Sequence, residues 1–185
     1  TIAPKALVSE PWTASCALLV IPGGRDLPYL SALDKAIPRI LDYVRQGGSY
    51  LGICAGAYFA SARVEWEIGT DLEVQGDRPL RFFPGTSRGC TYPGFQYNSE
   101  DGARTVTARL PTDQKYHGLY YNGGGECVIP SSVGGVTPLA YYEDEERPGM
   151  VAAPLHDFLF FLQQDRSSKQ KPDDSLCLER PLAAW

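Results

Sequence analysis

The chain has 185 residues, a formal net charge of -5 and a sequence pI near 5.0. This length allows one compact domain with its own core. The acidic balance and the lack of a Lys/Arg cluster argue against a nucleic-acid partner, because phosphate binding needs a basic surface. The five cysteines form no CxxC pair and have no histidine close by, which argues against a zinc site or a disulfide framework. A reducing, cytoplasmic location fits best.

No apolar run is long enough to cross a bilayer, and no charged-then-apolar signal segment opens the chain, so we expect no membrane partner. The sequence begins with Thr1 rather than an initiator methionine, which is consistent with processing or with a missing N-terminal piece. Residues 1–15 contain Pro4, Pro11 and Trp12, and we predict a loop or the tail of a lost element there.

The first strong signals along the chain form a strand, helix and strand. Residues 16–21 are an unbroken apolar run, typical of a strand buried on both faces, and this run ends at a Pro-Gly-Gly turn. Residues 31–46 carry apolar side chains at helical spacing, with Pro38 predicting a kink or a later start. Residues 49–53 predict a second buried strand. A βαβ unit of this kind makes the two strands parallel and places their ends side by side.

Cys54 falls in the turn between the strand at residues 49–53 and a helix predicted to open at residues 57–62. This is the position of the nucleophile in a nucleophile elbow, and Gly52, Ala55 and Gly56 supply the small residues that such a sharp turn needs. A helix N-terminus favours negative charge, so we expect Cys54 to be biased toward the reactive thiolate. The alternative is that Cys54 is a small buried apolar residue, as many free cysteines are.

The second half of the chain is rich in short strand patterns separated by Gly, Pro and Asn turns, and we predict a β-rich half that continues the sheet. Glu65 and Glu67 are interpreted as solvated residues of a helix face or a loop. After residue 153 the pattern is lost, so we predict one domain at 1–153 and an irregular C-terminal tail at 154–185. The predicted strands cover residues 72–74, 81–83, 105–108, 116–122, 127–129 and 138–142.

A set of ordered motifs resembles the class I glutamine amidotransferase-like domain at the N-terminus of fungal biotin–protein ligases. The likeness covers about residues 7–153 and implies an α/β fold with a flavodoxin-like, doubly wound, mostly parallel sheet. The motifs that carry it are at residues 20–29, 47–60, 64–67, 81–85, 92–95 and 120–125.

The resemblance implies that Cys54 attacks the side-chain amide of glutamine, forming a thioester and releasing ammonia. It also implies that the oxyanion is held by the backbone N–H groups of Ala55 and of Gly24, next to Gly23 in the Pro-Gly-Gly turn. Two backbone donors beside a nucleophile are what a tetrahedral oxyanion needs. No metal and no organic cofactor is implied. Asp26, just after the turn, is a candidate for orienting it.

Two other residues are candidates for the lip of the same crevice. Asn122 can donate and accept hydrogen bonds, and Gly123 permits a close approach of the backbone. The alternative is that the Asn-Gly pair marks a plain hairpin turn.

The sequence departs from the family pattern at both ends, so we expect an incomplete domain. Members of the family have a strand and a helix ahead of the position of Leu7. The superfamily also places a His-x-Glu motif after a final strand, whereas here His156 is followed by Asp157. His156 is nevertheless the histidine nearest the right place for a catalytic base. His117 has no acidic neighbour in a matching motif and is interpreted as a strand or surface residue.

Three functional hypotheses remain. The first is a Cys54-dependent amidotransferase or amidohydrolase acting on a small amide, in a degenerate or incomplete form. The second is a non-catalytic ligand-binding or regulatory module that uses the same crevice and contacts a ligase or another protein. The third is a partial gene product with no role of its own. Ligase activity itself is not indicated, because no adenylate-binding loop is present in the sequence.

Overall fold

The fold begins with a short helix that the sequence did not predict. The computed structural model describes residues 1–143 and the backbone of residues 160–162. Helix α1 (Pro4–Ser9) is followed by a 3-10 turn, η1 (Trp12–Ala14). Pro4 opens α1, where a missing N–H costs no hydrogen bond. The Arg39 side chain donates to the carbonyls of Leu7 and Val8, 2.9 and 2.6 Å away, and so ties this segment to the next helices.

The predicted strand, helix and strand are present, with the helical part divided into three. Strand β1 (Leu18–Ile21) leads to α2 (Asp26–Leu33), the 3-10 turn η2 (Asp34–Ala36), α3 (Ile37–Arg45) and β2 (Ser49–Gly52). β1 and β2 are parallel. The later helix start predicted from the proline is confirmed, because Pro38 lies in the first turn of α3.

The first sheet has the strand order β1-β2-β10. Strand β10 (Phe160–Leu162) pairs antiparallel with β2, although an irregular tail was predicted for this part of the chain. In β1 burial alternates: Leu19 and Ile21 are buried, whereas Leu18 and Val20 are 38% and 42% exposed. The prediction that this strand is buried on both faces is therefore wrong.

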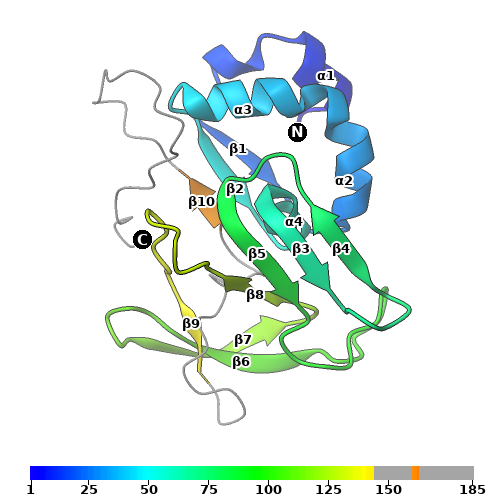
Figure 1. The fold of residues 1–185 in the computed structure, drawn as a ribbon, viewed down its shortest axis with the longest axis vertical. Coiled ribbons are helices and arrows are strands. Elements are labelled where there is room, and N and C mark those ends of the chain that lie inside the picture. The colour runs from blue at the N-terminus through cyan, green and yellow to red at the C-terminus, as the bar shows by residue number, and fades with distance from the viewer. Residues whose placement is uncertain (144–159, 163–185) are drawn as a thin grey trace.

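Two further sheets complete the described fold. Helix α4 (Ala55–Ala60) runs directly into β3 (Ser61–Trp66), which pairs with β4 (Val74–Asp77) and β5 (Phe83–Gly89), and β5 pairs with β8 (Gly125–Val128). The third sheet consists of β7 (Lys115–Tyr121), β6 (Arg104–Arg109) and β9 (Tyr141–Tyr142). Figure 1 shows α1 and α3 at one end, β6 and β7 at the other, and β3 to β5 between them.

The mixed α/β class is confirmed, with mostly antiparallel strands in the second half. A single, mostly parallel sheet is not what the described residues form. Two of their strand pairs are parallel, β1 with β2 and β3 with β5, and five are antiparallel. Parallel neighbours need a long crossover, whereas short turns such as that between β6 and β7 favour antiparallel pairing.

The main core lies between the helices α1 to α3 and the strands β1 and β2. Ile40 and Val44 of α3 and Tyr50 of β2 are fully buried there. A second cluster, around Tyr92 and Tyr121, lies beneath the third sheet. Among the described helices, none combines the length and apolar character needed to cross a membrane.

Candidate functional site

Cys54 lies at a sharp turn between β2 and α4, with φ 49° and ψ -112°. Residues other than glycine rarely adopt this backbone conformation, which persists only when the surrounding structure enforces it. Two sets of hydrogen bonds do so here. The Ile53 N–H donates to the carbonyl of Ile21 at 3.0 Å, and the N–H groups of Ala57 and Tyr58 donate to the carbonyl of Cys54. The turn is thus held by β1 on one side and by α4 on the other.

Gly52 and Gly56 allow the backbones of β1, β2 and α4 to touch. A Cβ on Gly52 would lie 2.6 Å from the Gly56 carbonyl group, and a Cβ on Gly56 would collide with the carbonyl of Ile21. The Tyr50 hydroxyl, buried between the same elements, donates to the Gly56 carbonyl at 2.8 Å. Any side chain at either glycine would push α4 away from the sheet.

The Pro22-Gly23-Gly24 turn lies beside Cys54. A Cβ on Gly23 would be 3.4 Å from the Cβ of Cys54, so Gly23 is at contact distance from the cysteine. Gly24 has φ +141°, which a side chain would strain. The Tyr29 hydroxyl lies 3.0 Å from the Pro22 carbonyl and 3.1 Å from that of Gly23, and its single proton is shared between them. Residues of α2 therefore anchor the turn.

Cys54 lines a pocket. Residues at the Pro-Gly-Gly turn and residues of the later strands and loops form the rest of its lining. Its volume is about 570 Å³, including the part open to solvent. The structure brings the predicted residues Gly24, Cys54, Ala55, Asn122 and Gly123 together in its lining. The remaining lining residues are Arg25, Asp26, Tyr58, Val64, Trp66, Val74, Phe95 and Tyr97.

Three aromatic rings, those of Trp66, Phe95 and Tyr97, line the pocket and form its aromatic wall. The Phe95 ring meets Trp66 at 5.2 Å and Tyr97 at 5.1 Å between centroids, both edge to face. A Cβ on Gly123 would lie 2.5 Å from the Phe95 ring, so this ring packs directly on the backbone of the 122–124 turn. The guanidinium of Arg25 stacks on the outer ring, Tyr97, 3.9 Å from its centroid.

Asn122 holds its own loop. Its Nδ2 donates to the carbonyl of Ser99 and to the Tyr120 hydroxyl, both at 3.2 Å. The plain hairpin considered as an alternative is wrong, because this turn joins strands β7 and β8 of two different sheets. It is therefore the connection that carries the chain from the third sheet to the rim of the pocket.

Asp26 follows the Gly-Gly turn at the start of α2 and is buried. One of its carboxylate oxygens accepts a hydrogen bond from Nε of Arg78 at 2.7 Å, and both side chains of the pair are almost fully enclosed. Nη1 of Arg78 donates to the carbonyls of Gly76 and Asp77 in β4. The ion pair thus attaches the turn to β4, in line with the predicted orienting role of Asp26. Sequence reasoning did not identify Arg78.

Glu65 lies on β3 and not on a helix face or in a loop. Hydrogen bonds from Arg63 first, and from Arg88 next, lower the pKa of its carboxyl. Glu67 follows the strand and accepts a hydrogen bond from the Cys90 N–H at 2.8 Å. Neither glutamate lines the pocket.

Two other cysteines, Cys90 and Cys127, differ from Cys54 in their surroundings. Burial raises the pKa of the Cys90 thiol, and a hydrogen bond with Glu67 adds to the shift. Burial also raises the pKa of Cys127 to about 12. Both are therefore held as neutral thiols near neutral pH. Cys54 is the cysteine that lines the pocket.

No histidine lines the pocket within residues 1–143. His117 lies on β7 and is exposed, with its Nδ1 3.1 Å from the Thr107 hydroxyl. His156 lies outside the described residues, so its predicted role as base stays a prediction. The same holds for a domain boundary at residue 153. Across the part of the chain that the structure describes, no group of three or more His, Cys, Asp or Glu side chains could hold a metal ion.

A strained cysteine between a buried strand and a helix, beside a Gly-Gly turn and open to a pocket, is a nucleophile-elbow arrangement. The sequence pattern of the family described as "Biotin-protein ligase, N terminal" matches residues 1–153. The chain belongs to this family.

Two curated relatives support this assignment. The chain is 46% identical over 147 residues to a biotin–protein ligase of Schizosaccharomyces pombe, a match that covers 77% of this chain and 23% of the ligase. It is 40% identical over 150 residues to an uncharacterized protein of Chlamydia muridarum, which covers 80% of this chain and 57% of that protein. The chain therefore spans about a quarter of the first relative and just over half of the second.

Proposed function

We propose that this chain is a class I amidotransferase-like domain in which Cys54 is the nucleophile toward a small amide. The observation that carries the proposal is the strained backbone of Cys54, enforced by backbone contacts between β1, β2 and α4, at the floor of a pocket. Backbone strain of this kind clusters at functional sites and persists only where the surrounding structure enforces it.

The proposed chemistry is acyl transfer to the cysteine. The sulfur of Cys54 attacks the amide carbonyl carbon, and the oxyanion that forms is held by the backbone N–H groups of Ala55 and Gly24. Collapse of the tetrahedral intermediate breaks the C–N bond, leaves a thioester on Cys54 and releases ammonia after proton transfer to the nitrogen. Water then hydrolyses the thioester to a carboxylate and restores the thiol. His156 is the candidate for the base that moves these protons.

The test is covalent labelling with a small uncharged amide electrophile, 2-chloroacetamide, followed by peptide mass spectrometry. We expect Cys54 to be labelled faster than Cys16, which is half-buried outside the pocket, and we expect Cys54→Ser to lose that label. Labelling of Cys54 at the rate of free cysteine would contradict a catalytic role. His156→Ala should slow the reaction if this residue is the base.

The second candidate function is a non-catalytic module that binds a small ligand in the same pocket and regulates, or contacts, a ligase or another protein. It is favoured by the family match and by the likeness to part of a biotin–protein ligase. If Cys54→Ser leaves ligand binding and capture of a biotin–protein ligase unchanged, this second function gains over the first. We also propose a cytoplasmic location, supported by four free cysteines among the described residues.

A further inference from the structure

We propose that the Cys54 pocket takes a monoanionic amide with an apolar or aromatic body in preference to a zwitterionic amino acid such as free glutamine. The inference rests on the proposed function for the reacting amide and goes beyond it in naming the class of ligand. Three features of the pocket lining support the inference: the cationic side chain of Arg25, the neighbouring Asp26 carboxylate, which an ion pair neutralises, and the aromatic wall.

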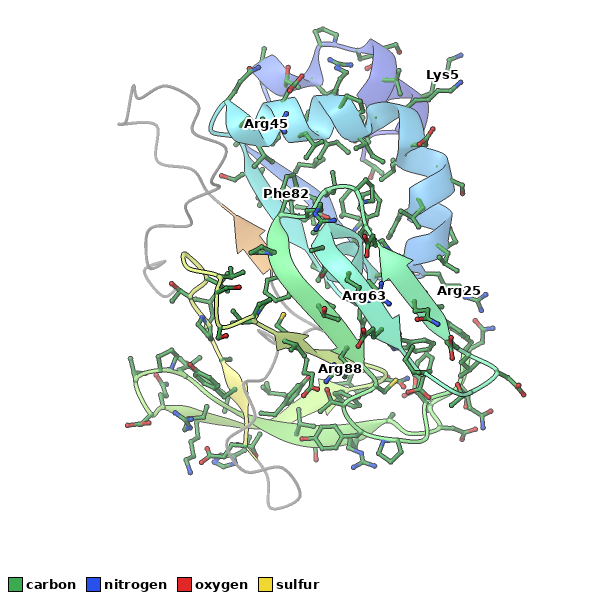
Figure 2. All side chains as sticks on the ribbon, in the orientation of Figure 1. Lys5, Arg25, Arg45, Arg63, Phe82 and Arg88 are labelled. Carbon is green, nitrogen blue, oxygen red and sulfur yellow. The ribbon has the colours of Figure 1, made fainter. Side chains whose placement is uncertain are left out.

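Arg25 gives the pocket its positive charge. The residue follows directly on Gly24, and its guanidinium is held by stacking on Tyr97, 3.9 Å from the ring centroid. Within residues 1–143, no carboxylate lies at ion-pair distance from it. A stacked guanidinium keeps its in-plane N–H donors free to bind a carboxylate. Figure 2 places Arg25 at the start of α2, beside β4.

The neighbouring carboxylate cannot offset this charge. Asp26 also lines the pocket, but it forms a 2.7 Å ion pair with Arg78, whose side chain is 2% exposed. The buried pair of Asp26 and Arg78 has no net charge. Arg25 is therefore the one group that gives the described lining its net positive charge. A ligand ammonium would meet this cation without a free carboxylate to compensate, which opposes binding of a zwitterion.

The aromatic wall favours a ligand with an apolar or aromatic body. Phe95 contacts Trp66 and Tyr97 edge to face, Trp66 and Tyr97 meet at a tilt of 43°, and Val64 and Val74 also line the pocket. The Arg25 guanidinium covers one face of the Tyr97 ring, which is therefore not available to a ligand cation. An amide with an apolar body would bury its surface here, whereas free glutamine has little apolar surface to bury.

The experiment compares three amides that share a glutamine side chain. N-benzoyl-L-glutamine is a monoanion with an aromatic body, its methyl ester is neutral with the same body, and L-glutamine is a zwitterion without it. Binding is measured by titration calorimetry and by saturation-transfer NMR on the full chain carrying Cys54→Ser, which cannot form the thioester. We expect N-benzoyl-L-glutamine to bind about tenfold more tightly than either of the others, the effect of one charge-assisted contact.

Variants at Arg25 test the cause of the preference. Arg25→Gln should reduce the preference for the anion over the ester to less than about threefold, and Arg25→Lys should keep part of it. Because Arg25 is exposed, these variants should fold, and far-UV circular dichroism checks this. The matched control is Arg45→Gln, at an exposed arginine of α3 that pairs with Asp42 and lies far from Arg25 in Figure 2.

Three results would overturn the inference: equal or tighter binding of glutamine, equal binding of the methyl ester, or no binding of any probe at about 1 mM. A preference that survives Arg25→Gln would also overturn it. The proposed function fails separately. If the anion binds as predicted but Cys54 of the wild-type chain is not labelled by the electrophile, the ligand class stands and the catalytic role does not.

Discussion

The two walls of the pocket are built in different ways. On the elbow wall, the Cys54 turn is fixed by backbone packed on backbone, with no space for a Cβ at Gly52 or Gly56, and the adjoining Gly-Gly turn is held by the Tyr29 hydroxyl and the Asp26–Arg78 ion pair. On the aromatic wall, Phe95 and Tyr97 come from a loop and are fixed by ring contacts and by hydrogen bonds such as those of Asn122. The comparison indicates that the position of the sulfur is rigidly specified, whereas side chains shape the surface that meets the ligand.

The largest effect should come from the buried ion pair behind the elbow wall. Asp26→Ala leaves the Arg78 guanidinium buried without its carboxylate, so we expect the free energy of unfolding to fall by about 3–5 kcal/mol. Urea denaturation measures this loss. The control is Asp42→Ala in the exposed pair with Arg45, for which we expect less than about 0.5 kcal/mol. Equal losses at the two sites would show that the turn is not anchored by the ion pair.

Gly56→Ala tests the backbone contact of the elbow wall directly. The new Cβ would meet the Ile21 carbonyl, and we expect a loss of stability of about 3 kcal/mol, with α4 displaced from the sheet. Gly134→Ala is the matched control, since a Cβ there meets nothing within 4 Å, and its effect should stay within about 0.5 kcal/mol. A tolerated Gly56→Ala would remove the distinction between the two walls.

Alkaline pH should weaken the fold through Cys127, which is buried in the main core. Burial raises the pKa of Cys127 to about 12, so the folded chain holds this proton more tightly than the unfolded chain. Stability is then fully present below the unfolded thiol pKa and falls as pH rises above it, by about 2 kcal/mol between pH 8.5 and 10. Denaturation midpoints at several pH values measure the slope. Cys127→Ala should reduce the slope and leave the part that is due to Cys90, whose thiol pKa is also raised, and an unchanged slope would contradict this origin.

The smallest stability effect should come from the aromatic wall. Phe95→Ala removes the ring that contacts both Trp66 and Tyr97, and because Phe95 is only half-buried we expect a loss of about 1–2 kcal/mol. Phe95→Leu, which keeps apolar bulk, should lose less. Urea denaturation of the two variants measures both losses in the free energy of unfolding. A loss as large as that of Gly56→Ala would mean that both walls share one structural core.

The contrast between the walls also explains which parts of the site could be predicted from the sequence. The elbow was predictable, because its requirements are local: a buried strand, small residues at Gly52 and Gly56, and a helix directly after Cys54. The Gly-Gly turn was predictable because a βαβ unit brings parallel strand ends together.

The rest depends on contacts between distant residues. Asp26 and Arg78 are separated by 52 positions, and no local pattern pairs them. Strand β3 was missed because its first residues continue the small-residue run of α4, and their strand pairing depends on β4 and β5. The direction of the second-half strands depends on which sheet each joins, and the turn at Asn122 shows how a hairpin-like signal can join two sheets instead.

The most direct test of the central claim is the rate of iodoacetamide alkylation at each cysteine of the native chain, followed by peptide mass spectrometry. We expect Cys54 to react faster than Cys16, and Cys90 and Cys127 to stay unmodified near neutral pH because burial keeps their thiols protonated. Cys54 reacting no faster than Cys16 would contradict the claim that the elbow presents a primed nucleophile to the pocket.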